Sequence, residues 1–137
     1  MKRIVVDTNV LVSFLTDRDA RQQARAARLF EAAAAGEVQL ILHQLVATEL
    51  IYVLRTVYAV DAAEVAATLH DLLALPGVTP VDDLPWPAVF ALWPRKIEGF
   101  VDAALVAVTR AGKHDAIATF DDRFIRRLSR LRLATAW

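Results

Sequence analysis

The sequence predicts a three-layer α/β/α sandwich in which helices cover both faces of a central, mostly parallel β-sheet. Short apolar segments alternate along the chain with longer segments whose apolar residues recur at helical spacing. The short segments are apolar throughout, which is typical of strands buried on both faces. No repeat or linker interrupts the 137 residues. We therefore expect one α/β domain spanning residues 1–137.

The first half of the chain supplies two predicted strands and three predicted helices. The first strand ends at Asp7, where Asp-Thr-Asn offers turn and helix-cap chemistry. Gly36 ends an Ala-rich helix, since glycine is a common residue at helix C-termini. The expected elements are a strand at 3–7, a helix containing 10–15, a helix over 19–35, a strand at 38–42 and a helix over 44–59.

Proline and glycine divide the second half of the chain. Pro76-Gly77 ends one predicted helix, Pro94 breaks a second and Gly112 closes a third. The expected elements are a helix over 62–75, a strand at 78–81, a helix over 86–93, a helix over 102–111, a strand at 116–120, a helix over 122–130 and a strand at 133–136.

Composition narrows the class of protein. Apolar residues make up 56% of the chain, which argues against disorder and favours large buried or oligomeric surfaces. The absence of cysteine excludes disulfides, thiolate zinc sites and cysteine nucleophiles. The 16 basic and 16 acidic residues balance, so strong nonspecific attraction to nucleic acid is not implied. No apolar run is long enough to span a membrane, and we expect a soluble, cytoplasmic protein.

Four carboxylates lie where a solvated surface would not place them. Asp7 and Asp121 each follow a predicted strand, and ligands of open α/β sheets bind outside the carboxyl ends of strands. Glu49 and Asp102 interrupt apolar helical segments with no Lys or Arg on the same face. An ionised carboxylate is costly to bury unless something offsets its charge. A hard divalent cation would offset all four, because Mg²⁺ and Mn²⁺ prefer carboxylate oxygen.

Each acid also has a structural interpretation. Asp7 and Asp102 are of a type favoured at helix N-caps, and Asp121 suits a turn beside a solvated Asp122. Glu49 is the hardest to explain structurally, since acids on apolar helix faces are rare. The joint pattern favours a metal site. Asp121 is its least secure member, because Asp122 can take the same role.

Four segments in this order and spacing resemble the PIN domain, and the size of the chain resembles the VapC toxins of bacterial toxin–antitoxin pairs. The segments are Ile-Val-Val-Asp-Thr-Asn-Val-Leu-Val, Thr-Glu-Leu-Ile-Tyr-Val-Leu, Phe-Val-Asp-Ala-Ala-Leu-Val-Ala and Ala-Thr-Phe-Asp-Asp-Arg-Phe. The resemblance implies a Mg²⁺- or Mn²⁺-dependent endoribonuclease whose catalytic, metal-binding acids are Asp7, Glu49, Asp102 and Asp121. Thr8, Asn9 and Thr119 fall on the polar positions that accompany these acids.

The same resemblance implies the cofactor and the partners. One or two metal ions would activate a water and neutralise charge on an RNA phosphate. A small VapB-like antitoxin and a second copy of the chain in a homodimer are the implied protein partners. Pro85, Pro87 and Pro94 depart from the family pattern, which leaves groove shape and substrate choice open.

Two further features have competing interpretations. Arg123, Arg126 and Arg127 follow Asp121 at helical spacing, where RNA phosphate contact competes with a solvated helix face. Trp86 and Trp93 suit base stacking, although core or dimer packing is the commoner role.

The alternative function is a PIN-fold or receiver-like α/β binding or signalling module without nuclease activity. A receiver-like protein would have an acidic pair after the first strand and a Lys after the last strand, and this sequence has neither. An aspartyl phosphatase would need a second acid where Asn9 stands.

Overall fold

The computed structural model describes residues 1–137, and its centre is a five-stranded sheet. The strands are β1 (Lys2–Val6), β2 (Val38–His43), β3 (Val78–Val81), β4 (Ala116–Ala118) and β5 (Ala134–Thr135). They lie in the order β3-β2-β1-β4-β5. All four neighbouring pairs are parallel, so the sheet predicted to be mostly parallel is parallel throughout.

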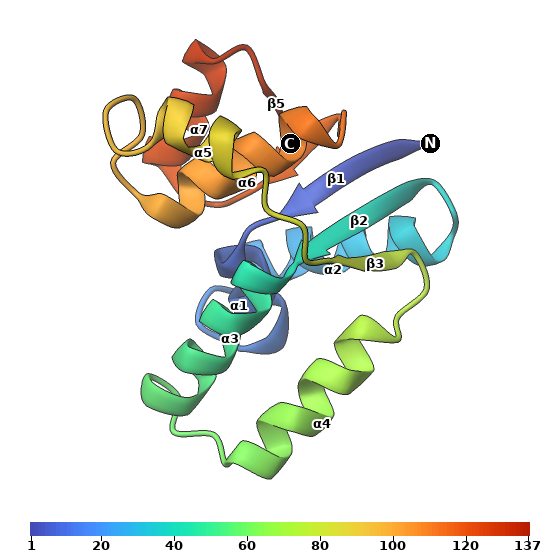
Figure 1. The fold of residues 1–137 in the computed structure, drawn as a ribbon. Coiled ribbons are helices and arrows are strands. Elements are labelled where there is room, and N and C mark those ends of the chain that lie inside the picture. Colours follow the sequence, from blue (N-terminus) through green and yellow to red (C-terminus); the bar gives the residue numbers. More distant parts are fainter.

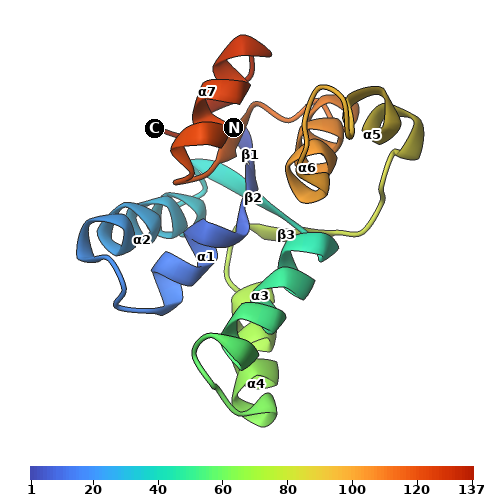
Figure 2. The same ribbon diagram turned by 90° about the vertical axis from the view of Figure 1, so that its left-hand side faces the viewer.

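Seven helices cover the two faces of this sheet. They are α1 (Thr8–Leu15), α2 (Ala20–Ala34), α3 (Gln44–Thr56), α4 (Ala62–Leu73), α5 (Trp86–Leu92), α6 (Phe100–Ala111) and α7 (Asp122–Arg130). Figures 1 and 2 show α1 to α4 on one side of the sheet and α5 to α7 on the other, with α3 and α4 projecting away from it. The predicted three-layer α/β/α sandwich is therefore confirmed. None of the helices combines the length and apolar character that crossing a membrane requires.

The predicted elements are all present and differ only at their ends. The strand predicted at 116–120 stops at Ala118, because the backbone N–H of Phe120 donates to the Asn9 side chain (2.8 Å) and not to a neighbouring strand. The helix predicted to begin at Asp102 begins at Phe100, with Gly99 as its N-cap. Both differences lie beside the candidate site.

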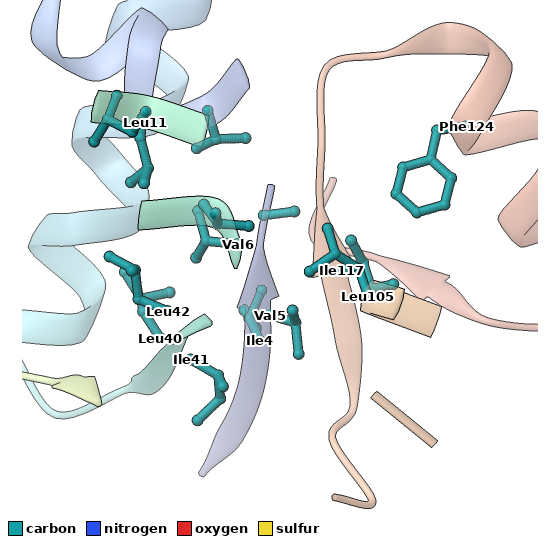
Figure 3. Packing of buried hydrophobic residues seen from close by; sticks show 14 of the residues in the cluster. Ile4, Val5, Val6, Leu11, Leu40, Ile41, Leu42, Leu105, Ile117 and Phe124 are labelled. Carbon is teal, nitrogen blue, oxygen red and sulfur yellow. The ribbon is translucent and has the colours of Figure 1, made fainter. Parts of the chain in front are cut away.

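The middle strand of the sheet anchors the core. Val5 and Ile117 are fully buried on the neighbouring strands β1 and β4. Leu11 of α1 packs on one face, and Leu105 of α6 and Phe124 of α7 pack on the other (Figure 3). Because both faces are covered, the buried strand segments at 4–6, 40–42 and 116–118 are apolar throughout, which explains the apolar runs in the sequence.

The direction in which the chain crosses the sheet reverses beside β1. From β1 the chain moves outward through β2 to β3, then crosses back to β4 on the opposite side of β1. The connections that leave β1 and β4 therefore diverge and leave a crevice at the carboxyl ends of these two strands. Asp7 directly follows β1 and Thr119 directly follows β4, so the topology brings both to this crevice.

Candidate metal centre

Asp7 is buried at the carboxyl end of β1, with only 6% of its surface exposed. Its Oδ1 accepts the backbone N–H of Thr8 (2.8 Å), which makes Asp7 the N-cap of α1. Its Oδ2 accepts the Thr119 hydroxyl (2.8 Å) and the Asn9 side-chain amide (3.1 Å). Asp7 is thus a helix cap, but the cap uses only one of its oxygens, and side chains from α1 and from the segment after β4 orient the other.

Asn9 and Thr119 tie the ends of β1 and β4 together. The Asn9 amide also donates to the Thr119 hydroxyl (3.0 Å), while its oxygen accepts the Phe120 N–H. The Thr119 hydroxyl in turn accepts the backbone N–H of Asp121 (3.2 Å). This network fixes Asp7 relative to the start of the chain segment that carries Asp121. The supporting positions that the family resemblance assigned to Asn9 and Thr119 therefore have direct contacts with Asp7.

The other three predicted acids reach the same crevice from different elements. Glu49 comes from α3 and Asp102 from the first turn of α6, and both are half-buried. Asp121 is exposed and caps α7, where its Oδ1 accepts the N–H groups of Arg123 (2.9 Å) and Phe124 (3.3 Å). All four carboxylates line one cavity of about 340 Å³.

The acids of this cavity repel one another. Burial raises the pKa of Asp7 from 3.8 to about 6, against the hydrogen bonds from Thr119 and Thr8, and the charges of Glu49 and Asp121 add to the rise. Burial also raises the pKa of Asp102 to about 6, with further increases from Asp7, Asp121 and Glu49. A divalent cation among them would lower the pKa of both groups and relieve the repulsion.

The chemistry of the donor set fits a hard cation. Carboxylate oxygens are the preferred ligands of Mg²⁺ and Mn²⁺, and this cavity offers four such groups and no histidine. No three acidic or histidine side chains already stand at ligand distance from a common point. Mg²⁺ needs no such cage, because it keeps several waters and binds directly to one or two carboxylates.

The structure distinguishes between candidate residues whose roles the sequence left open. Asp121 lines the cavity and Asp122 does not, so the contacts favour Asp121 over its neighbour. The N-cap interpretation of Asp102 is wrong, because Gly99 occupies that position. Thr8 supports Asp7 through its backbone N–H, and its own buried hydroxyl has no hydrogen-bond partner.

A second cavity of about 320 Å³ adjoins the first and shares Asp102 and Asp121 with it. Arg123 and Arg127 line this cavity, whereas Arg126 is exposed and lies outside it. The Arg127 guanidinium also donates to the Lys96 carbonyl and lowers the pKa of Asp102. Two of the three predicted arginines therefore border the acids.

Among the charged residues of the first cavity, sequence reasoning missed one, Arg18, in the loop between α1 and α2. No local pattern marks it, because a loop residue has no periodicity that places its side chain. Trp93 packs edge-on against Phe100 with ring centroids 5.2 Å apart, which agrees with the packing interpretation. Trp86 lies 5.9 Å from the same ring and stays half exposed.

The fold and the cavity define a class of protein, a parallel α/β/α domain with a carboxylate-lined crevice where the strand order reverses. The chain belongs to the PIN domain family, whose model matches residues 4–130. Among curated proteins, no significant match was found.

Solved structures with the same fold span nearly the whole chain. VapC20 of Mycobacterium tuberculosis, described as a Sarcin-Ricin loop cleaving toxin, is 26% identical over 90% of this chain and 93% of that chain, with a TM-score of 0.65. PAE2754 from Pyrobaculum aerophilum is 19% identical over 92% of this chain and 79% of that chain, with a TM-score of 0.64. VapBC-1 from nontypeable Haemophilus influenzae is 13% identical over 97% of this chain and 96% of that chain, with a TM-score of 0.65. The last two show the fold alone.

Proposed function

We propose that this chain is the nuclease toxin of a VapBC-type pair, an endoribonuclease that hydrolyses RNA phosphodiester bonds with Mg²⁺ or Mn²⁺. The observation that carries the proposal is the single cavity onto which Asp7, Glu49, Asp102 and Asp121 all face. Membership of the PIN domain family and the similarity to VapC20 support a nuclease of the toxin class.

The roles of the residues follow from their environment. Asp7 and Asp102, assisted by Glu49 and Asp121, would hold one or two cations. The bound metal would lower the pKa of a coordinated water and neutralise charge on the reacting phosphate. Thr119 and Asn9 hold the Asp7 carboxylate in one orientation. The acids bind the cation and form no bond to RNA, so no covalent intermediate is expected.

The partners follow from the proposed class. RNA is the substrate, and a VapB-like antitoxin is the protein partner, supported by a similar structure described as VapBC-1. A homodimer in the cytoplasm remains our prediction from the family resemblance.

Cleavage of RNA by the purified protein tests the proposal. We expect cleavage with Mg²⁺ or Mn²⁺, none with EDTA, and a loss of at least about 100-fold in Asp7→Asn and Glu49→Gln. Asp61→Asn and Glu64→Gln are matched controls, because the N-cap of α4 and a residue of its first turn are both exposed and lie outside the cavity. Activity that survives both EDTA and the two site substitutions would contradict the metal-nuclease proposal. A purified protein that binds RNA without cutting it would support the alternative function, a binding module without nuclease activity.

A further inference from the structure

The Arg18 guanidinium borders the acidic cavity without being paired to any of its acids. Arg18 lines the cavity together with Asp7, Glu49 and Asp102. The single ion pair within 4.0 Å in the structure joins His70 to Asp71. The charge of Arg18 is therefore not cancelled by direct contact with a carboxylate.

Neutral partners hold this guanidinium in place. Its Nε donates to the Ser13 hydroxyl (3.2 Å) and its Nη2 to the Gln22 side-chain oxygen (3.3 Å). The Ser13 hydroxyl also donates to Gln22 (2.8 Å), and Ser13 itself is fully buried in α1. Two side chains from α1 and α2 thus orient Arg18, while Nη1 makes no hydrogen bond. An oriented, unpaired guanidinium suits an anionic group such as phosphate.

Each of the two cavities that the acids line also has a cationic side chain in its lining. Arg18 lines the first cavity, and Arg123 and Arg127 line the second. The two cavities meet at Asp102 and Asp121, which line both. The carboxylates repel an RNA phosphate that lies over them until a cation binds there. The neighbouring phosphates of the strand therefore need positively charged side chains nearby.

We infer that Arg18 binds an RNA phosphate next to the scissile one, in the cavity that Arg123 and Arg127 do not line. This inference rests on the proposed nuclease function. Arg18 positions the strand and does not touch the bond that breaks. Its loss therefore weakens RNA binding more than it slows the chemical step.

Binding of a short fluorescein-labelled single-stranded RNA to Arg18→Ala tests the inference, measured by anisotropy in the Asp7→Asn background at several KCl concentrations. We expect binding about tenfold weaker and a slope of log affinity against log salt that is shallower by about 0.7, the value for one lost phosphate contact on a single strand. Arg18→Lys, which keeps the charge, restores most of the slope. In the otherwise unchanged protein, KM rises more than kcat falls.

Arg28→Ala is the matched control, because it removes the same charge from an exposed position on α2 that lies outside both cavities. Equal binding and equal salt slopes for Arg18→Ala and Arg28→Ala would overturn the inference, even where the unsubstituted protein cleaves RNA. Equal losses in Arg18→Ala and Arg18→Lys would also overturn it, since they indicate a purely structural tether. Arg18-dependent binding in a protein that does not cleave would overturn the proposed function and leave Arg18 as a phosphate contact of an RNA-binding protein.

Discussion

At the scale of single residues, Asp7 shows how one side chain serves both the fold and the candidate site. Its Oδ1 caps α1, and its Oδ2 is oriented by Thr119 and Asn9. The position after β1 was visible in the sequence. The hydrogen bond from Thr119 was not, because the two residues are 112 positions apart. Buried carboxylates keep their charge only with such donors.

Removing the Thr119 hydroxyl tests its role in orienting Asp7. We expect Thr119→Val to weaken Mn²⁺ binding about tenfold or more, because Asp7 loses a donor and its pKa rises further. Isothermal titration calorimetry at neutral pH measures the affinity. Thr119→Ser keeps the hydroxyl and should retain most of it. Thr109→Val is the matched control, since the buried Thr109 hydroxyl bonds only the Leu105 carbonyl within α6. Equal Mn²⁺ affinities in all three variants would contradict this role.

Asp102 offers a second test, because its charge is costly without a cation. We expect Asp102→Asn to raise the free energy of unfolding of the metal-free protein by about 1 kcal/mol at neutral pH, a value discounted for its partial exposure. The same change should weaken Mn²⁺ binding. Thermal melts in EDTA and in Mn²⁺ measure both effects. Asp122 is exposed and lies outside the cavity, so Asp122→Asn should change neither the stability nor the Mn²⁺ affinity. A destabilised Asp102→Asn protein in EDTA would refute the prediction.

At the scale of elements, three helices begin at the candidate site. Asp7 caps α1, Asp121 caps α7, and Asp102 lies in the first turn of α6. The partial positive charge of a helix N-terminus stabilises nearby carboxylates. In a parallel sheet, helices that follow strands start at the same edge, so α1 and α7 begin beside each other. The sheet topology thus gathers the acids and also part of what stabilises them.

Two substitutions of Asp121 separate its structural role as the N-cap of α7 from the effect of its charge at the cavity. We expect Asp121→Ala to lower the free energy of unfolding by about 1 kcal/mol, because the N–H groups of Arg123 and Phe124 lose their acceptor. Asp121→Asn should keep the cap and the stability but lose the charge at the cavity. Urea unfolding in EDTA measures the stability, and RNA cleavage measures the charge effect. Wild-type cleavage by a stable Asp121→Asn protein would remove Asp121 from the site.

At the scale of the whole molecule, the acidic cavity couples stability to pH. The pKa values of Asp7 and Asp102 are about 6 in the folded chain and 3.8 in the unfolded reference. Between these values the folded chain holds protons that the unfolded chain releases. The contribution of these two groups to the free energy of unfolding therefore rises as pH falls from about 7 to about 4.

Metal binding has the opposite pH dependence, because the cation needs ionised carboxylates. We expect Mn²⁺ affinity to fall as pH falls through about 6, while the metal-free protein gains stability from the same protonation. Thermal melts across this pH range, with EDTA or with Mn²⁺, measure both trends. Asp102→Asn should flatten the EDTA curve. Parallel curves for this variant and the unsubstituted protein would contradict the coupling.

The projecting hairpin of α3 and α4 is where we expect the predicted homodimer to form (Figure 1). Val57 is 70% exposed and Ile51 is 38% exposed, and Ile51 lines an apolar cavity between these helices. Apolar surface of this kind favours contact with another chain. The double variant Ile51→Asp, Val57→Asp should shift sedimentation toward the monomer. Ala24→Asp, at an exposed position on α2, should leave the sedimentation unchanged. An unchanged dimer in the double variant would place the contact elsewhere.

The order of strands and helices, the parallel sheet and the four candidate acids could all be predicted from the sequence, because apolar periodicity and strand ends are local properties of the chain. Three features were decided by the tertiary structure alone. Asp121 faces the cavity and Asp122 does not, Asp102 lies inside α6 instead of capping it, and Arg18 joins the acids from a loop. Which side chains line the cavity depends on the segments that the fold brings together at the carboxyl ends of β1 and β4, and no local pattern encodes that long-range packing.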